Sequence, residues 1–230
     1  MMPWVLDMQW HDVCFAHWRA DVGTLERALP PGVELDRFEG DAWLAVVPFR
    51  MSGVRLRVGP TLPGFGSVPE LNLRTYVRVR GRPGVWFFSL DAASPIAVVS
   101  ARIMTALPYF HAAIATSERD GTIAYRSDRT HRGVVASHFD ARYTPRGEPT
   151  AAAPTTLDAF LHERYRFFSM RGNTLVTARI RHAPWRLQSA SMDIATNTLG
   201  DLIGHPLTRP PDRVTFARHV HVQATTTGRA

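Results

Sequence analysis

Residues 70–90 restrict the fold of this chain most strongly, because they have the pattern of a β-hairpin. Polar and apolar residues alternate from Glu70 to Arg80, which is typical of a strand with two different faces. The turn sequence GRPG follows at 81–84, and the next stretch, Val85–Leu90, is apolar on both faces. A strand of that kind is covered on both sides. The hairpin therefore predicts a sheet with further layers packed against it.

Other strand-like stretches flank the hairpin, and helical stretches are few. Strand patterns occur at Asp12–Ala20, Val33–Phe38, Ala42–Met51, Val54–Val58, in three stretches up to Tyr143, and at Thr174–Arg181 and Val214–Gln223. Helices are expected at Asp21–Leu29, Ser94–Leu107 and Leu157–Tyr165. Strands without a regular β-α-β alternation argue against a doubly wound sheet. We therefore expect a β-rich fold, a barrel or a sandwich, with a few covering helices.

Three stretches rich in Gly, Pro or small residues lie outside these patterns. The segment Gly59–Gly66 is expected to be a loop, and Thr144–Thr156 a surface loop inside one domain. The last residues, 224–230, are expected to be a disordered tail. We thus expect a single domain at 1–223 that precedes this tail.

The composition favours a soluble, cytoplasmic protein. The chain has 230 residues, 45% of them hydrophobic, and at this length roughly 70% of the unfolded surface can be buried. No apolar run approaches the ~18 residues that a bilayer span requires, and the first residues have no signal-peptide pattern. The single cysteine, Cys14, cannot form an internal disulfide, which is consistent with a reducing compartment. We expect no membrane partner.

All 27 basic residues are arginine, and the sequence contains no lysine. Hence no side-chain amine exists that could form a Schiff base. The arginines are spread along the chain among 20 acidic residues, whereas a nucleic-acid surface would show clustered charge. Despite the net charge of +7 and a pI near 10.6, we expect no nucleic-acid partner.

Common cofactor and metal motifs are absent from the sequence. It has no GxGxxG, no GxxxxGK[ST] and no GxSxG motif, and HExxH and CxxC pairs are missing. His219 and His221 would share one strand face, but two imidazoles without a third ligand make a weak metal site. Cys14 is expected to be buried and inert. We expect neither a metal nor a cofactor.

The polar face of the strand at 70–80 carries the residues most suited to chemistry. It bears Glu70, Asn72, Arg74 and Tyr76, spaced about 7 Å per two-residue step. Arg74 can hold a carboxylate through two parallel N–H bonds, and Glu70 can act as acid or base. The same row can also be a structural ladder on the solvent face of an antiparallel sheet. The alternation alone leaves both interpretations open.

The ionisation of Glu70 depends on whether Arg74 reaches it. A direct ion pair would lower the pKa of Glu70 and make it an anchor, whereas an apolar wall near Phe87 or Phe88 would raise that pKa and suit acid–base chemistry. A buried arginine without a carboxylate costs several kcal/mol. We therefore expect the pair, and expect Arg74→Met to destabilise the fold by ~3 kcal/mol or more.

Six short phrases together resemble a known family across nearly the whole chain. They are FAHW (Phe15–Trp18), ELNLRTYV (Glu70–Val77), PGVWFFSLDA (Pro83–Ala92), LPYFHA (Leu107–Ala112), FLHERY (Phe160–Tyr165) and HAPWRL (His182–Leu187). In this order they resemble the YqjF-like uncharacterised bacterial family, a branch of the acetoacetate-decarboxylase-like superfamily. The resemblance implies a β-barrel around a central, funnel-shaped pocket.

The resemblance also shows what this chain lacks. Acetoacetate decarboxylases use a lysine that forms an imine with the substrate, in a pattern comparable to Ala101–Phe110. Arg102 and Pro108 match that pattern, but Tyr109 and Phe110 occupy the lysine positions. Glu70 looks similar to the pocket carboxylate of the superfamily, which implies that the polar row faces a pocket.

Two functions therefore remain open for this chain. The first is an enzyme that acts on a small oxo or hydroxy acid by acid–base chemistry, such as a lyase, a decarboxylase-like enzyme or a hydrolase without an imine. The alternative is a non-catalytic protein that binds or senses a small anionic organic molecule. A homo-oligomer is compatible with the sequence. The expected catalytic residues are Glu70 and Arg74, and the expected substrate-binding residues are Asn72, Tyr76, Phe88 and Tyr109.

Overall fold

The structure, a computed structural model, describes residues 4–57 and 66–230, and strands dominate it. The strands are β1 (Trp4–Ala20), β2 (Glu34–Leu35), β3 (Ala42–Leu56), β4 (Ser67–Val79), β5 (Arg82–Ala92), β6 (Tyr109–Arg119), β7 (Thr122–Arg129), β8 (His138–Ala151), β9 (Arg166–Arg171), β10 (Thr174–Arg181), β11 (Arg186–Asn197), β12 (Arg213–Thr225) and β13 (Gly228–Arg229). The helices are α1 (Val22–Ala28), α2 (Pro95–Thr105), α3 (Leu157–His162) and a 3-10 turn, η1 (Leu199–Ile203). The expected β-rich fold is confirmed.

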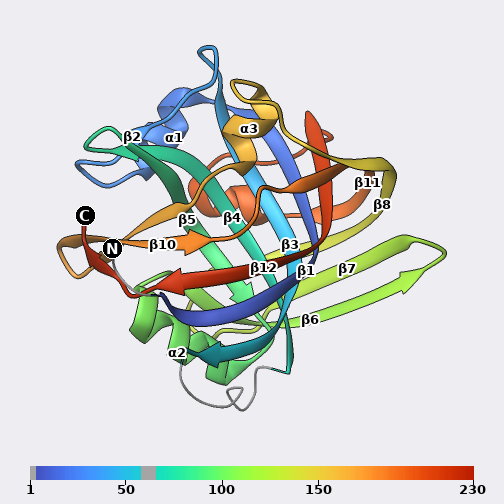
Figure 1. The fold of residues 1–230 in the computed structure, drawn as a ribbon, viewed down its shortest axis with the longest axis horizontal. Coiled ribbons are helices and arrows are strands. Elements are labelled where there is room, and N and C mark those ends of the chain that lie inside the picture. Colours follow the sequence, from blue (N-terminus) through green and yellow to red (C-terminus); the bar gives the residue numbers. More distant parts are fainter. Residues whose placement is uncertain (1–3, 58–65) are drawn as a thin grey trace.

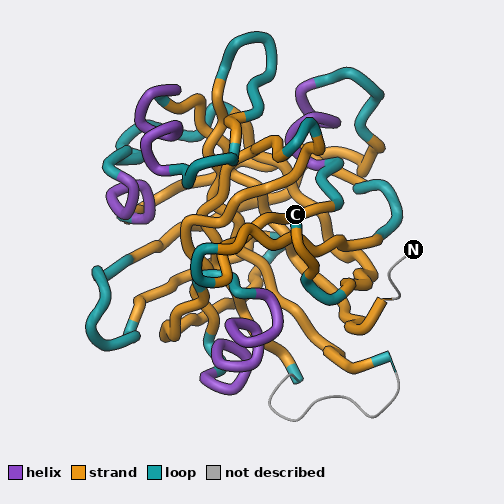
Figure 2. The backbone as a smooth tube through the Cα atoms, turned by 90° about the vertical axis from the view of Figure 1, so that its left-hand side faces the viewer, coloured by secondary structure: helices purple, strands orange, loops and turns teal. Residues whose placement is uncertain are grey.

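The strands form one sheet that closes on itself in two places. Its order is β13-β10-β9-β5-β6-β7-β8-β11-β12-β1-β3-β4-β2, with additional pairings of β10 with β12 and of β5 with β4. These pairings create two closed rings that share β1, β3, β4, β5 and β12. The first ring is completed by β9 and β10, and the second by β6, β7, β8 and β11. Figure 2 shows the strands crossing through the interior, with the helices at the periphery.

The shared strands send alternate side chains into two different cores. On β1, Val13 and Phe15 belong to one buried cluster, whereas Cys14 and Ala16 belong to another. Successive side chains of a strand point to opposite faces, so these residues of β1 are buried on both faces of the strand. One strand thereby contributes to both cores.

The three α-helices lie at the ends of the rings. In Figure 1, α1 and α3 lie at the upper end and α2 lies across the lower end. The sequence predicts α2 closely. Ser94 caps it by accepting a hydrogen bond from the amide of Ala97, and Pro95 occupies the first turn. Ala106, in the left-handed conformation (φ 56°), ends it.

Several boundaries differ from the sequence-based expectation. The two strands expected at 42–51 and 54–58 are one strand, β3, which continues through Gly53 at φ 61°. β9 and β11 were not expected. The first half of the expected loop at 144–156 belongs to β8, because it pairs with β11. The loop expected at 59–66 lies, except for Gly66, outside the described residues.

The C-terminal residues also differ from the expected disordered tail. β12 continues to Thr225, and β13 pairs with β10 through Thr177 and Val176. The guanidinium of Arg80 donates a hydrogen bond to the carbonyl oxygen of Ala230. Backbone pairing at the edge of the first ring therefore holds residues that composition alone marks as a tail. Within the described parts of the chain, no helix is long and apolar enough to cross a membrane.

Candidate functional site

A cavity of about 150 Å³ lies inside the first ring. Strands β1, β3, β4, β5 and β9 line it, together with α2 and the start of β6. Apolar side chains form most of its wall. The polar exceptions include Glu70, Asn72 and Arg74, which follow one another on β4. The polar row of the hairpin strand thus faces this cavity and not open solvent.

The register of the β4–β5 hairpin determines which side chains reach the cavity. Asn72 pairs with Leu90 and Arg74 pairs with Phe87, with an irregularity between these pairs that leaves Phe88 unpaired. A bulge of this kind changes the face to which the following side chains point. Leu90 and Phe87 consequently line the cavity, whereas Phe88 packs against the second core. Phe88, expected as a substrate-binding residue, therefore does not line this cavity.

Tyr76 also lies outside the cavity wall. It is fully buried, and its hydroxyl group is 2.6 Å from Nε2 of His17. The ring packs 5.4 Å from that of Phe160, near α3, so the cavity ends before this position. Burial raises the pKa of the Tyr76 hydroxyl. The expected substrate contact at Tyr76 is therefore replaced by a core hydrogen bond.

Glu70 is a buried carboxyl group with only neutral hydrogen-bond partners. Its side chain is 3% exposed, and the hydroxyl of Tyr109 donates a hydrogen bond of 2.9 Å to its Oε2 atom. Burial raises the pKa of Glu70 to about 8, although the hydrogen bonds from Tyr109 and Asn72 lower it. The negative charge of Asp91 raises it further. Glu70 is consequently protonated for the most part at neutral pH.

Arg74 is a half-buried cation without a carboxylate partner. Among the described residues, no Asp or Glu oxygen lies within 4.0 Å of its guanidinium, and its Nε atom has no hydrogen-bond partner. The guanidinium lies 5.3 Å from the ring centre of Phe15 and 6.0 Å from that of Tyr76. The expected ion pair between Arg74 and Glu70 is thus wrong, because aromatic faces, not a carboxylate, surround the charge.

Three histidines near Arg74 were not predicted as site residues, although each lies in one of the phrases quoted above: His17 in FAHW, His162 in FLHERY and His182 in HAPWRL. Burial lowers the pKa of His17, His162 and His182, and the positive charge of Arg74 lowers each one further. His162 has a pKa of about 4, and its Nε2 atom lies 2.7 Å from the hydroxyl of Thr215. The histidines are therefore neutral at pH 7. For His17 and His162, the feature of the sequence that could have indicated a buried histidine was its place inside an apolar strand or helix, in the phrases FAHW and FLHERY.

The histidines singled out in the sequence lie elsewhere. His221 pairs with Asp7 at 2.8 Å, and the ring of His219 lies 5.1 Å from that of His11. In the described ranges, no cluster of three His, Cys, Asp or Glu side chains could hold a metal ion. Cys14 is fully buried, and burial raises its pKa. The polar groups of the cavity wall therefore include the guanidinium groups of Arg74, Arg164 and Arg166, the protonated carboxyl of Glu70, the amide of Asn72 and the phenol of Tyr109.

Solved structures with the same fold come from the acetoacetate-decarboxylase-like group. An acetoacetate-decarboxylase-like enzyme from Sphingomonas wittichii RW1 gives a TM-score of 0.66 at 15% identity, covering 99% of this chain and 93% of that one. Acetoacetate decarboxylase from Legionella pneumophila gives 0.65 at 14% identity over 97% and 88%. The enduracididine biosynthesis enzyme MppR, complexed with pyruvate, gives 0.60 at 16% identity over 99% and 89%. At these identities the likeness shows the fold alone.

Sequence similarity is much higher to an uncharacterized protein of Bacillus subtilis (strain 168), YqjF. The two chains are 42% identical over 207 residues, which is 90% of this chain and 84% of YqjF. The DUF2071 family, described as an uncharacterized conserved protein, matches residues 7–221. The resemblance seen in the sequence is thereby confirmed: this chain is similar to YqjF, has the acetoacetate-decarboxylase-like fold, and belongs to the DUF2071 family.

Proposed function

We propose that this protein is an enzyme that acts on an organic oxo or hydroxy acid by proton transfer, without an imine intermediate. Arg74 binds the carboxylate of the substrate, and Glu70 donates a proton to an oxygen atom of the bound acid. Asn72 and Tyr109 orient Glu70. The observation that carries the proposal is the presence of an unpaired guanidinium and a protonated carboxyl group in one apolar cavity.

The unpaired state of Arg74 supports its role as the anion-binding group. A guanidinium in a partly buried site loses hydration, and a carboxylate restores that loss through charge-assisted, bidentate hydrogen bonds. Of the two other arginines that line the cavity, Arg164 already has such a partner in Asp36 at 2.7 Å, and Arg166 donates a hydrogen bond to the hydroxyl of Thr177. A carboxylate brought by a ligand would complete the same arrangement at Arg74.

The raised pKa of Glu70 supports its role as the proton donor. A general acid works best when its pKa lies near the working pH. With a pKa of about 8, Glu70 carries the proton at pH 7 and can still release it. The accepting oxygen is either a carbonyl oxygen, which becomes an enol oxygen, or a hydroxyl group, which leaves as water. In both cases a water molecule takes the proton that the adjacent carbon loses as the new C=C bond forms. The Tyr109 hydroxyl, 2.9 Å away, then stabilises the carboxylate that forms.

The absence of lysine separates this proposal from the chemistry of acetoacetate decarboxylases. No side chain of this sequence can form the imine. The position of the expected lysine carries Tyr109, whose phenol contacts Glu70 instead. The solved structures with the same fold include an acetoacetate decarboxylase and an enzyme complexed with pyruvate. Both acetoacetate and pyruvate are oxo acids, which supports an oxo acid as the substrate.

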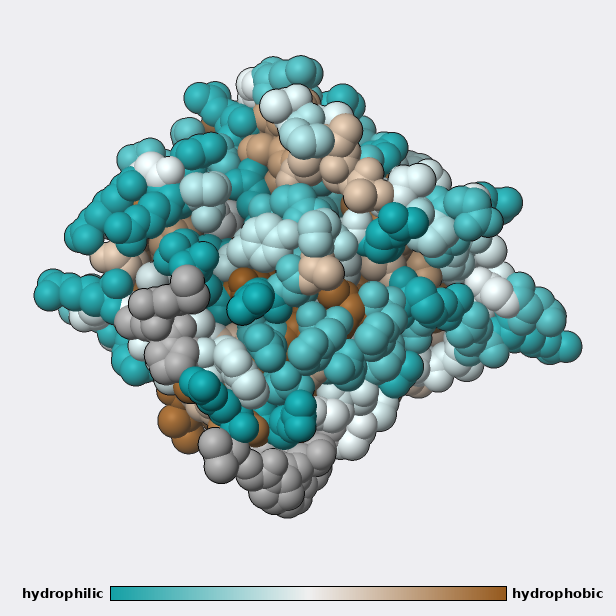
Figure 3. Space-filling model, viewed as in Figure 1, coloured by the Kyte–Doolittle hydropathy of each residue, from teal (hydrophilic) through white to brown (hydrophobic). Residues whose placement is uncertain are grey.

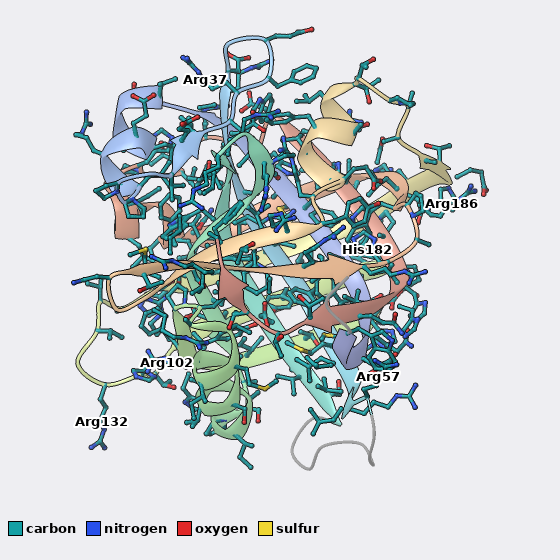
Figure 4. The ribbon with its side chains drawn as sticks, turned by 60° about the vertical axis from the view of Figure 1, so that its left-hand side comes forward. Arg37, Arg57, Arg102, Arg132, His182 and Arg186 are labelled. Atoms are coloured by element: carbon teal, nitrogen blue, oxygen red, sulfur yellow. The ribbon has the colours of Figure 1, made fainter. Side chains whose placement is uncertain are left out.

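A panel of oxo and hydroxy acids, followed by proton NMR in D2O, tests the proposal. We expect product formation or deuterium incorporation with at least one acid. Glu70→Gln should lower kcat by about 100-fold or more, since general acids contribute 10²–10⁴-fold. Arg74→Met should raise KM. Arg37→Met is the matched control, because Arg37 is exposed at the end of the molecule far from α2 (Figure 4).

The alternative function predicts a different outcome of the same experiment. A binding or sensing protein would bind acids through Arg74 without any turnover. Glu70→Gln would then leave the affinity almost unchanged, and no acid of the panel would exchange protons. That result would reject the enzymatic proposal and retain the anion site.

A further inference from the structure

The walls of the cavity set a limit on what its ligand can be. Beyond the polar row on β4 and the guanidinium groups of Arg164 and Arg166, large apolar side chains from several elements form most of the wall. They include Trp10, Phe15, Phe49, Phe87 and Phe167. A small, highly hydrated acid such as pyruvate would leave most of this surface without a partner, and apolar surface contributes to binding only when a ligand covers it.

Helix α2 closes the lower end of the cavity with small residues. Ala97, Ser100 and Ala101 face the cavity, and the next turn adds Met104 and Thr105. The opposite face of the helix carries Ile96, Val99 and Ile103, which are 57%, 58% and 72% exposed. Figure 3 shows hydrophobic residues gathered at the lower left, where Figure 1 places α2. The small side chains therefore leave room on the cavity side of the helix.

The spacing along β4 shows the direction in which a ligand would extend. Arg74 lies toward α3: its guanidinium is 5.3 Å from the ring centre of Phe15, and that ring lies 4.8 Å from the ring of His162 in this helix. Glu70 is four residues closer to the α2 end, about 13 Å along the strand at ~3.3 Å per residue. An acid held at Arg74 that also reaches Glu70 must therefore place several carbon atoms between its carboxylate and its reacting oxygen.

A second cavity lies beside α2 and shares part of its wall with the first. It measures about 300 Å³ and shares Leu6, Met104, Thr105, Phe167 and Ala224 with the first cavity. Thr225, Thr226 and Thr227 form part of its outer wall. The two cavities thus lie on either side of shared side chains near α2.

We infer that the ligand is a carboxylic acid with an apolar body of about six carbon atoms or an aromatic ring, held by its carboxylate at Arg74 and extending toward α2. The inference rests on the proposed function, because it uses Arg74 as the carboxylate site. The size follows from the cavity volume: an apolar protein cavity of about 150 Å³ accommodates benzene.

Calorimetric titration with a series of acids tests the inference. The probes are acetate, pyruvate, butyrate, hexanoate and 3-phenylpropionate, with hexan-1-ol as the uncharged control. Each buried methylene group should tighten binding about fourfold, which corresponds to about 0.8 kcal/mol. Hexanoate should therefore bind on the order of 200-fold more tightly than acetate. Arg74→Met should weaken hexanoate binding and leave hexan-1-ol binding unchanged.

Two substitutions on α2 test the position of the apolar body. Ala101→Phe places a ring in the cavity and should abolish hexanoate binding, while acetate still binds near Arg74. Val99→Phe places the same ring on the exposed face of the same helix and should change nothing. Acetate binding shows that the Ala101→Phe variant is folded, and the smaller Ala101→Val change should weaken hexanoate by an intermediate factor.

The outcomes separate this inference from the proposed function. If acetate or pyruvate binds as tightly as hexanoate and Arg74→Met weakens both, the inference is wrong and the proposed function stands. If hexan-1-ol binds as tightly as hexanoate and Arg74→Met has no effect, the carboxylate site is wrong, and with it both proposals. Failure of every probe to bind overturns the inference, and the turnover panel then decides the proposed function alone.

Discussion

Each face of the β4–β5 hairpin has an arginine and a carboxyl group beside it, but the two pairs behave differently: Arg74 and Glu70 of β4 face the cavity, whereas Asp91 of β5 faces the second ring and meets Arg129 of β7. On the face toward the second ring, Nε of Arg129 donates to Asp91 at 2.8 Å, and the side chains are 3% and 1% exposed. Ser89 and the carbonyl oxygen of Val135 accept the other hydrogen bonds of the guanidinium. On the face toward the cavity, Arg74 and Glu70 have no contact with each other.

The difference shows that pairing decides whether a buried charge contributes to stability or remains available for a ligand. Arg129 and Asp91 neutralise each other, so removal of one leaves the other buried and uncompensated. Removal of Arg74 would leave no carboxylate without a partner. Glu70 keeps its proton and thereby avoids the free-energy cost of a buried charge. The following predictions, in order of effect, test this contrast.

Arg129→Met should lower the free energy of unfolding by about 3–5 kcal/mol, because Asp91 would lose the partner that compensates its buried charge. Urea denaturation at pH 7 measures this, with Arg37→Met as an exposed control that should stay within about 0.5 kcal/mol of the parent. A decrease in the free energy of unfolding of less than about 1 kcal/mol would mean that the Arg129–Asp91 pair contributes no more to stability than the unpaired Arg74 does.

Glu70→Gln should change the pH dependence of stability. Glu70 binds its proton up to a pKa of about 8 in the folded state, but only up to about 4.5 in the unfolded state. Between these values the unfolded state holds fewer protons, so the stability of the parent falls as pH rises. Relative to the parent, the variant should therefore gain about 3 kcal/mol between pH 4 and pH 7. Parallel stability curves for the two proteins would contradict a raised pKa.

Tyr109→Phe should lower stability by about 1 kcal/mol, the value of one hydrogen bond. The hydrogen bond from Tyr109 lowers the pKa of Glu70, so its removal should raise that pKa further. The high-pH limb of the pH–rate profile should then shift to higher pH, since the protonated form of Glu70 is the active one. A shift toward lower pH would show that Tyr109 does not donate to Glu70.

Arg74→Met should have the smallest effect on stability, within about 1 kcal/mol, because no carboxylate depends on Arg74. This differs from the ~3 kcal/mol expected from the sequence, which assumed an ion pair. The substitution should also raise the pKa of His162 and His182, since the charge of Arg74 lowers both. Histidine NMR titration measures that change. A stability loss as large as that of Arg129→Met would remove the contrast between the two faces.

The sequence predicted the polar row on β4 well, because the two-residue period of a strand is a local property. Glu70, Asn72 and Arg74 share the cavity wall as the alternation requires. Tyr76 obeys the same alternation but lies beyond the end of the cavity, beside His17. The end of the cavity is determined by packing between elements that are distant in sequence. The alternation of polar and apolar residues within one strand gives no information about that packing.

Two further expectations differ from the structure, each for its own physical reason: that Phe88 lines the cavity, and that Arg74 forms an ion pair with Glu70. A bulge in β5 shifts the register by one residue, and no Gly or Pro marks it in the stretch from Val85 to Leu90. An ion pair between Arg74 and Glu70 would require both side chains to reach across two strand steps. It would also require Glu70 to lose its proton, and the sequence alone does not show whether it does. Asp91 and Arg129, 38 residues apart, form the pair that Glu70 and Arg74 do not.

A direct measurement of the Glu70 pKa tests the central claim most sharply. Carboxyl carbon NMR of protein labelled at glutamate, with Glu70→Gln to assign the signal, gives this value between pH 3 and pH 10. The account predicts one carboxyl group that titrates near pH 8, absent from the variant. Titration of the Glu70 signal below its ordinary value of about 4.5 would show an ionised, paired carboxylate, and would contradict the account.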